Sequence, residues 1–79
     1  MNEYVVIFFT QSGAIKFDRK AKRRNIECKL MPVPRILSSS CGICARIKFD
    51  GHVKELVDDE VDKIYLIKDK NYEIVYSEE

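Results

Sequence analysis

The sequence predicts a single α+β domain in which two helices cover one face of an antiparallel β-sheet. Its 79 residues leave room for one core only. Hydrophobic residues make up 46% of the chain and charged residues 34%, which is typical of a folded chain rather than a disordered one. Stretches with the two-residue period of strands alternate with stretches of helical period, so we treat residues 1–79 as one domain.

Residues 3–9 predict a central strand. Their sequence, EYVVIFF, consists mainly of β-branched and aromatic residues and is apolar at both odd and even positions. Because alternate side chains of a strand point to opposite faces, both faces of this strand should be at least partly covered. The strand is therefore expected inside the sheet rather than at its edge.

A helix is expected next. Residues 10–13, TQSG, supply hydroxyl groups suited to a helix N-cap. Ala14, Phe17 and Ala21 follow at spacings of three and four, which places them on one helical face. Asn25 is a suitable C-terminal cap. We expect the apolar face of this helix to pack against the sheet.

Residues 26–31 predict a half-buried edge strand. Ile26, Cys28 and Leu30 alternate with charged residues, so one side should pack on the core while the other faces solvent. Cys28 falls on the buried side, where a thiol behaves as a small hydrophobic group. Pro32 should end the strand because proline cannot donate to a strand ladder.

Further strands and a second helix complete the predicted fold. Residues 43–49 and 63–67 are expected to be strands, residues 72–76 a fifth strand or a tail, and residues 53–61 a short helix. The order β-α-β-β-α-β is that of a ferredoxin-like sandwich, in which the first and third strands are central. The C-terminal strand would be an addition to this sandwich, and its exposed edge could pair with a second copy of the chain.

Charge is divided unevenly along the chain. Residues 1–50 carry ten Lys and Arg against four Asp and Glu, whereas residues 51–79 carry four against nine. The basic residues are densest from Arg19 to Arg24, which we call the basic segment. Such a run can bind an acidic partner, but most such runs are solvated helix faces. Nucleic-acid binding is disfavoured, because residues 43–49 offer only Phe49 where RNA-binding sheets carry several aromatic side chains.

The cysteines and the N-terminus predict a cytoplasmic protein. Three cysteines cannot all pair within the chain, and the N-terminal segment lacks the pattern of a secretory signal. No apolar run approaches the roughly 18 residues that a membrane helix needs, so no membrane span is expected.

The residues best suited to chemistry lie between the second and third predicted strands. The segment PVPRILSSSCGIC, residues 32–44, combines rigid prolines, hydroxyl groups, a fixed positive charge and two cysteines. Cations and hydrogen-bond donors favour the thiolate form of cysteine, which is the nucleophile. A glycine within such a loop permits a backbone conformation that a side chain would hinder. The candidate site residues are Pro34, Arg35, Ser38, Ser39, Ser40, Cys41, Gly42 and Cys44.

Cys41 and Cys44 form a CxxC pair, which raises the alternative of disulfide exchange. Three extended steps span about 10 Å, more than the roughly 7 Å that a disulfide tolerates between Cα atoms. Because residue 44 begins a strand, an intramolecular disulfide would require a turn at Gly42. Cys44 shares its parity with Arg46 and Lys48, so it should face the helix-free side of the sheet.

Metal and cofactor sites are not expected. A zinc site could be assembled only from Cys28, Cys41, Cys44 and His52, which lack the two clean ligand pairs of zinc fingers. A Cys–His hydrolase is also disfavoured, since so short a chain leaves little room for a substrate cleft.

The stretch LMPVPRILSSSCGICARI resembles the bacterial selenium/sulfur carrier-like family. The resemblance covers about residues 3–68 and is most specific over residues 32–42, where members carry a Pro-x-Pro-Arg, a serine-rich step and a Ser-Cys-Gly. It implies that Cys41 is the carrier cysteine, while Cys44 lies outside the pattern as a possible second thiol. The supporting residues that it implies are Pro34, Arg35, Ser39, Ser40 and Gly42.

The resemblance implies a small carrier that holds sulfur or selenium on Cys41, as a persulfide or selenosulfide, between a donor enzyme and an acceptor enzyme. We expect a carrier rather than a stand-alone enzyme, because of the chain's length. The alternative is a non-catalytic protein–protein interaction module whose cysteines are structural. The two hypotheses differ in a testable way, since only the carrier needs a reactive Cys41.

Overall fold

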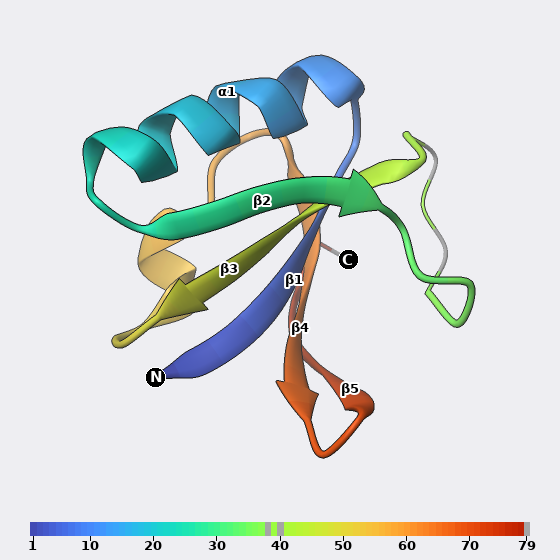
Figure 1. The fold of residues 1–79 in the computed structure, drawn as a ribbon. Coiled ribbons are helices and arrows are strands. Elements are labelled where there is room, and N and C mark those ends of the chain that lie inside the picture. Colours follow the sequence, from blue (N-terminus) through green and yellow to red (C-terminus); the bar gives the residue numbers. More distant parts are fainter. Residues whose placement is uncertain (38, 40, 79) are drawn as a thin grey trace.

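A computed structural model describes residues 1–37, 39 and 41–78 and shows a small α+β fold (Figure 1). Its five-stranded sheet is antiparallel throughout, with the strand order β2-β3-β1-β4-β5. The elements are β1 (Asn2–Phe8), α1 (Gln11–Arg23), β2 (Glu27–Pro32), β3 (Ile43–Phe49), the 3₁₀ turn η1 (Val53–Leu56), β4 (Val61–Lys68) and β5 (Asn71–Ser77).

The first strand lies at the centre of the sheet, as its doubly apolar sequence predicts. It pairs with β3 on one side and with β4 on the other. Every residue from Tyr4 to Phe8 is buried, and Val6, Ile7 and Phe8 have no exposed surface. Alternate side chains enter two different clusters, one on each face of the sheet. The sequence prediction of a strand covered on both faces is confirmed.

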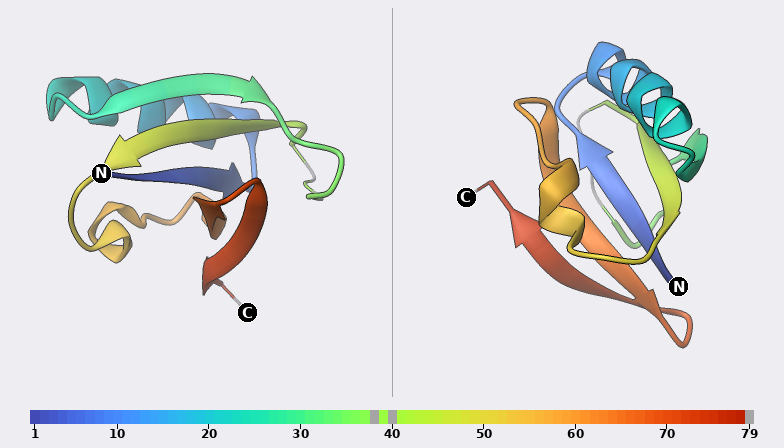
Figure 2. Two further views of the ribbon diagram at one scale, coloured as in Figure 1. Left: turned by 60° about the horizontal axis from the view of Figure 1, so that its bottom comes forward. Right: turned by 90° about the vertical axis from the view of Figure 1, so that its left-hand side faces the viewer.

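Helix α1 covers one face of the sheet (Figure 2). The Thr10 hydroxyl caps its start by accepting the Gly13 N–H at 3.0 Å. The Phe17 ring packs on Phe8 with 5.2 Å between ring centroids. Just beyond the helix, Asn25 adopts φ 58°, a left-handed conformation that asparagine tolerates better than most residues. The predicted start and apolar face of this helix are confirmed, whereas its C-cap is Arg24 and Asn25 is the residue that follows.

The predicted second α-helix is wrong: the described residues between β3 and β4 form one 3₁₀ turn, Val53–Leu56. In this turn Val53 is buried in the main core, which lies between the sheet and α1 and is called the helix-side core below, and Leu56 packs against the same core. The apolar spacing that suggested a helix therefore fits the 3₁₀ turn. Val57 then returns to extended backbone with ψ 132°. Bends at Asp50 and Gly51 and a turn at Asp59 and Glu60 occupy the two ends of this connection. The described fold therefore has one helix, where the ferredoxin-like prediction has two.

The C-terminal segment is a strand rather than a tail. Asp69 and Lys70 both adopt positive φ, at 49° and 72°, and link β4 to β5 as a tight hairpin. The Tyr65 and Tyr72 rings pack edge to face across this hairpin, with 6.5 Å between centroids. β5 thus forms one edge of the sheet and β2 forms the other.

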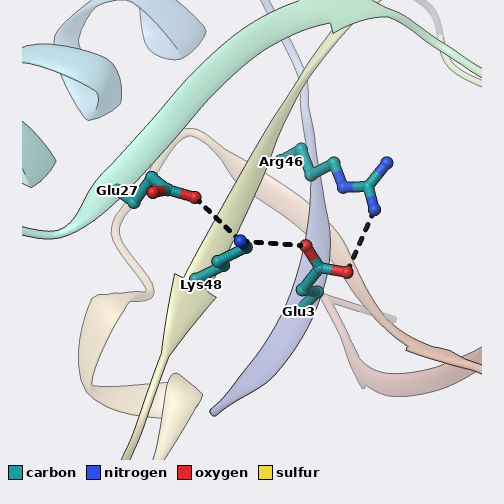
Figure 3. Close-up of polar contacts among 4 residues, drawn as sticks. All are labelled: Glu3, Glu27, Arg46 and Lys48. Carbon is teal, nitrogen blue, oxygen red and sulfur yellow. Dashed lines mark hydrogen bonds and ion pairs between the residues drawn. The ribbon is translucent and has the colours of Figure 1, made fainter.

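The helix-free face of the sheet is partly apolar and partly charged. Val5, Ile7 and Cys44 are buried there as a second, smaller cluster. At the other end of the face, Glu3 links β1 to β3 through Arg46 at 3.0 Å and Lys48 at 3.9 Å, and Lys48 reaches Glu27 on β2 at 3.4 Å (Figure 3). Their side chains are 31–71% exposed, so we expect these pairs to contribute little to stability and mainly to keep this end of the face polar.

Replacing Gly13 with alanine is expected to destabilise the fold. A Cβ at this buried position would lie 2.5 Å from Glu60 Cβ and 2.7 Å from Glu60 Oε2. Overpacking of this kind costs about 1–3 kcal/mol, which outweighs the gain of about 1 kcal/mol in helix propensity. Urea unfolding should therefore give a lower free energy of unfolding for Gly13→Ala. The neighbouring exposed variant Ser12→Ala should stay within about 0.5 kcal/mol of wild type, and equal effects of the two changes would contradict the steric explanation.

Candidate functional site

The loop between β2 and β3 holds the candidate site and projects beyond the sheet next to the start of α1 (Figure 1). Its two ends are joined by a backbone hydrogen bond from the Val33 N–H to the Gly42 carbonyl, at 3.2 Å. A tight turn follows, in which the Leu37 N–H donates to the Pro34 carbonyl at 3.0 Å. Val33 and Leu37 pack on the helix-free cluster, whereas Cys41 packs on the helix-side core. The loop therefore passes around the end of the sheet from one face to the other.

Cys41 is half-buried near the end of this loop, with its sulfur enclosed by polar groups. Its Sγ–H donates to the Ile43 carbonyl at 3.0 Å, and Sγ lies 3.4 Å from Ser39 Oγ. The Cys41 N–H also donates to Ser39 Oγ, at 3.3 Å. The next residue, Gly42, has φ 79°, a left-handed conformation that most side chains would strain. The structure thus brings Ser39, Cys41 and Gly42 together as one local unit.

The thiol and the thiolate forms of Cys41 can make different hydrogen bonds with these two groups. A thiol can donate to the Ile43 carbonyl, but a thiolate has no proton to donate and is repelled by that oxygen. The Ser39 hydroxyl can rotate and donate to a thiolate instead. The described contacts thus place one acceptor, the Ile43 carbonyl, and one group able to donate, the Ser39 hydroxyl, within hydrogen-bond distance of the Cys41 sulfur.

The remaining predicted site residues differ in what the structure shows of them. Pro34 is half-buried and shapes the turn through its carbonyl, as described above. Arg35 is exposed in that turn, and among the described residues it forms no ion pair that would bring its charge to Cys41. Ser38 and Ser40 lie outside the described residues.

Cys44 occupies a different environment from Cys41, although only two residues separate them. It is fully buried in the cluster with Val5 and Ile7, on the helix-free face as its parity predicts. Its Sγ–H donates to the Pro32 carbonyl at 3.8 Å. Burial, followed by the nearby Cys41, raises the pKa of Cys44 from 9.0 to about 11. All three cysteines are free, so no disulfide joins Cys41 to Cys44 here.

Cys28 lies on β2, on the helix side, and packs on the main core. Burial raises the pKa of the Cys28 thiol from 9.0 to about 12, and the neighbouring Asp18 carboxylate adds to the increase. Such a thiol is protonated and unreactive at neutral pH. Cys28 therefore behaves as the small core residue that the sequence predicts.

The basic segment lies at the opposite end of α1 from the loop. Lys22 pairs with Asp18 at 2.9 Å and Lys20 with Asp58 at 3.2 Å, and all of its basic side chains are exposed. Part of the segment borders a groove of about 270 Å³ between α1 and the η1 region, with an apolar floor. The groove is lined by Phe17, Lys20, Ala21, Arg23, Arg24, Ile26, Glu55, Leu56, Val57 and Asp58. This groove is separate from the site around Cys41.

The part of the chain that the structure describes holds no group of three or more His, Cys, Asp and Glu side chains that could bind a metal ion. In particular, Cys44 and Cys28 lie on opposite faces of the sheet. Over the same residues, no helix has the length and apolar character needed to cross a membrane.

Sequence reasoning missed one residue of the site. Gln11, the first residue of α1, donates from Nε2 to the Cys41 carbonyl at 3.1 Å. The sequence identifies residues 10–13 only as a helix start, and the contact joins positions 30 residues apart. No local pattern in the sequence signals such a contact, because the contact forms only when the loop folds back to the start of α1.

A comparison with known protein families identifies the family of the chain. Residues 3–74 match the family described as "Putative Se/S carrier protein-like", and the match covers most of the chain. The chain therefore belongs to this family, as the resemblance predicts. No curated protein and no solved structure matches the chain significantly.

Alkylation at pH 8 should label Cys41 selectively. With a pKa of about 11, only roughly one Cys44 thiol in a thousand is ionised at that pH, and Cys28 is ionised even less. Burial of Cys44 further blocks the reagent. A short pulse of iodoacetamide on the folded protein, followed by peptide fragmentation, measures the label at each cysteine. Labelling of Cys44 or Cys28 at the rate of Cys41 would contradict these environments, and urea-unfolded protein, in which all three should react, is the control.

Proposed function

We propose that this protein carries sulfur or selenium as a persulfide or selenosulfide on Cys41, between a donor enzyme and an acceptor enzyme in the cytoplasm. The observation that carries the proposal is the difference between the thiols: the half-buried Cys41 sulfur contacts Ser39 and the Ile43 carbonyl, whereas desolvation raises the pKa values of Cys44 and Cys28. Membership of the carrier-like family supports the same role.

The loading step is a thiol exchange that needs no outside oxidant. The Cys41 thiolate attacks the outer sulfur of a persulfide on the donor enzyme, such as a cysteine desulfurase. A new S–S bond forms at Cys41, the donor's S–S bond breaks, and its electron pair stays on the donor thiolate. The Ser39 hydroxyl, 3.4 Å from Cys41 Sγ, would donate to the thiolate before the attack. With selenium, the outer atom is replaced and the electron count is unchanged.

In the unloading step Cys41 is the leaving group, whereas in the loading step it is the nucleophile. A nucleophile of the acceptor enzyme attacks the outer sulfur, and the Cys41 thiolate leaves with the electron pair of the S–S bond. It is then protonated from solvent and can donate to the Ile43 carbonyl again. Sulfur leaves in the oxidation state in which it arrived, so neither step requires a cofactor of the carrier.

Intact-mass spectrometry tests the proposal directly. Incubation with a cysteine desulfurase and cysteine should add the mass of one sulfur atom to wild-type protein, and reductant should remove it. Cys41→Ser should show no adduct, while Cys28→Ser should load as wild type does, because desolvation and Asp18 raise the pKa of the Cys28 thiol and keep it protonated. A wild-type chain that gains no sulfur on any cysteine, with the desulfurase turning over, would refute the carrier function.

The same variants test the alternative of a structural interaction module. Cys41 is half-buried, so Cys41→Ser should change the free energy of unfolding by less than about 1 kcal/mol. A large loss of stability in Cys41→Ser, together with no reaction of this thiol in the wild type, would favour the module instead.

A further inference from the structure

The start of α1 is tied to the candidate site through a single side chain. The Gln11 amide donates to the Cys41 carbonyl at 3.1 Å, and the described residues provide no other hydrogen bond to that carbonyl. Gln11 is exposed and is the first residue of the helix, so its own backbone is fixed by the cap at Thr10. The contact thus joins a rigid element to the loop that carries the thiol.

The two consecutive peptides on either side of Gly42 are each held by one hydrogen bond. On the helix side Gln11 binds the Cys41 carbonyl, and on the β2 side the Val33 N–H binds the Gly42 carbonyl at 3.2 Å. The left-handed Gly42, at φ 79°, connects these two anchored carbonyls. If the Gln11 contact is lost, the described residues leave no hydrogen bond to the Cys41 carbonyl, and Cys41 keeps its contacts with Ser39, the Ile43 carbonyl and the core.

The sulfur must change partners during the proposed reaction while its backbone stays in place. At rest Sγ–H donates to the Ile43 carbonyl, and this bond is lost when the thiol ionises. If the Cys41 peptide is free to turn, the sulfur can leave the position where Ser39 and an incoming persulfide meet it. If the peptide is held, only the side chain rotates. Reaction rates depend strongly on such positioning of the nucleophile.

An electrostatic effect of the helix on the thiol is a weaker explanation of this contact. The positive end of α1 is already met by a carboxylate, since Glu60 accepts from the Thr10 hydroxyl at 2.9 Å and packs against Gly13. The charge that the helix end would present to the thiol is therefore largely offset by Glu60. We therefore explain the contact by its geometry, since the Gln11 side chain holds the Cys41 carbonyl in place.

We propose that Gln11 is a positioning residue for the carrier thiol, whose side-chain amide fixes the Cys41 carbonyl so that the sulfur rotates without displacing its backbone. This proposal rests on the carrier function proposed above. It assigns to the start of α1 a role in transfer in addition to its role in the core. Gln11 does not touch the reacting sulfur and acts through the Cys41 peptide alone.

Substitutions that separate donor capacity from side-chain length test this role. Gln11→Met keeps the length and removes the donor, whereas Gln11→Lys keeps a donor of similar reach. Ser12→Ala is the matched control on the next exposed residue of the helix. For each variant, initial rates of sulfur transfer from a desulfurase supplied with cysteine are measured as a function of carrier concentration. The loss of one hydrogen bond predicts that kcat for Gln11→Met falls roughly two- to tenfold, while KM stays within about twofold.

Rescue and a spectroscopic signal distinguish positioning from a general structural effect. Gln11→Lys should recover most of the wild-type kcat, and Ser12→Ala should keep it. The amide resonance of Gly42 belongs to the same peptide unit as the Cys41 carbonyl, so it should shift in Gln11→Met and return towards wild type in Gln11→Lys. Resonances of the core strands should not move.

The outcomes separate the two proposals. If wild-type protein loads sulfur and Gln11→Met transfers at the same rate, the positioning role is overturned and the carrier function stands. If Gln11→Lys is as slow as Gln11→Met, or the Gly42 resonance does not respond, the hydrogen-bond explanation is overturned as well. If wild-type protein accepts no sulfur at all, the carrier function falls, and the positioning role falls with it.

Discussion

The burial of β1 on both faces is the constraint on which the rest of the structure depends. A strand with apolar side chains at every position from Tyr4 to Phe8 needs a cover on each side of the sheet. Helix α1 supplies the cover on one side, but no helix of the described residues supplies the other. There the cover comes from neighbouring strands and from the loop after β2, through Val33 and Leu37. Two residues of the loop that carries the candidate thiol therefore also help to cover this face of the sheet.

The fold was predictable from the sequence where short-range periodicity decides the structure. The apolar run of β1, the capped helix and the alternation in β2 and β3 are local signals, and all of them form as predicted. The second helix failed because the spacing of Val53 and Leu56 suits one 3₁₀ turn as well as a helix. The length available between β3 and β4 decides between them, and this length depends on where the strands end. Strand ends are set by pairing across the sheet, which periodicity does not report.

In the candidate site, too, the features set by neighbouring residues were predictable, whereas those set by distant residues were not. Ser39, Cys41 and Gly42 were predicted as one group because they are neighbours along the chain, and the structure places them in contact. The parity of β3 also placed Cys44 on the helix-free face correctly. The depth of its burial was not predictable, since it depends on the loop folding over that face. Gln11 was missed for the related reason that its partner is distant in sequence and is reached only after the loop has closed.

The different environments of the three thiols bear on the molecule's response to oxidation. A protein with two accessible cysteines can close a disulfide, but here Cys44 is fully buried and Cys28, on β2, packs on the main core. A disulfide from Cys41 to Cys44 would require the buried Cys44 side chain to leave its cluster, so we expect oxidised Cys41 to form mixed disulfides with other molecules first. The redox state of Cys41 would then follow that of the thiols around the molecule.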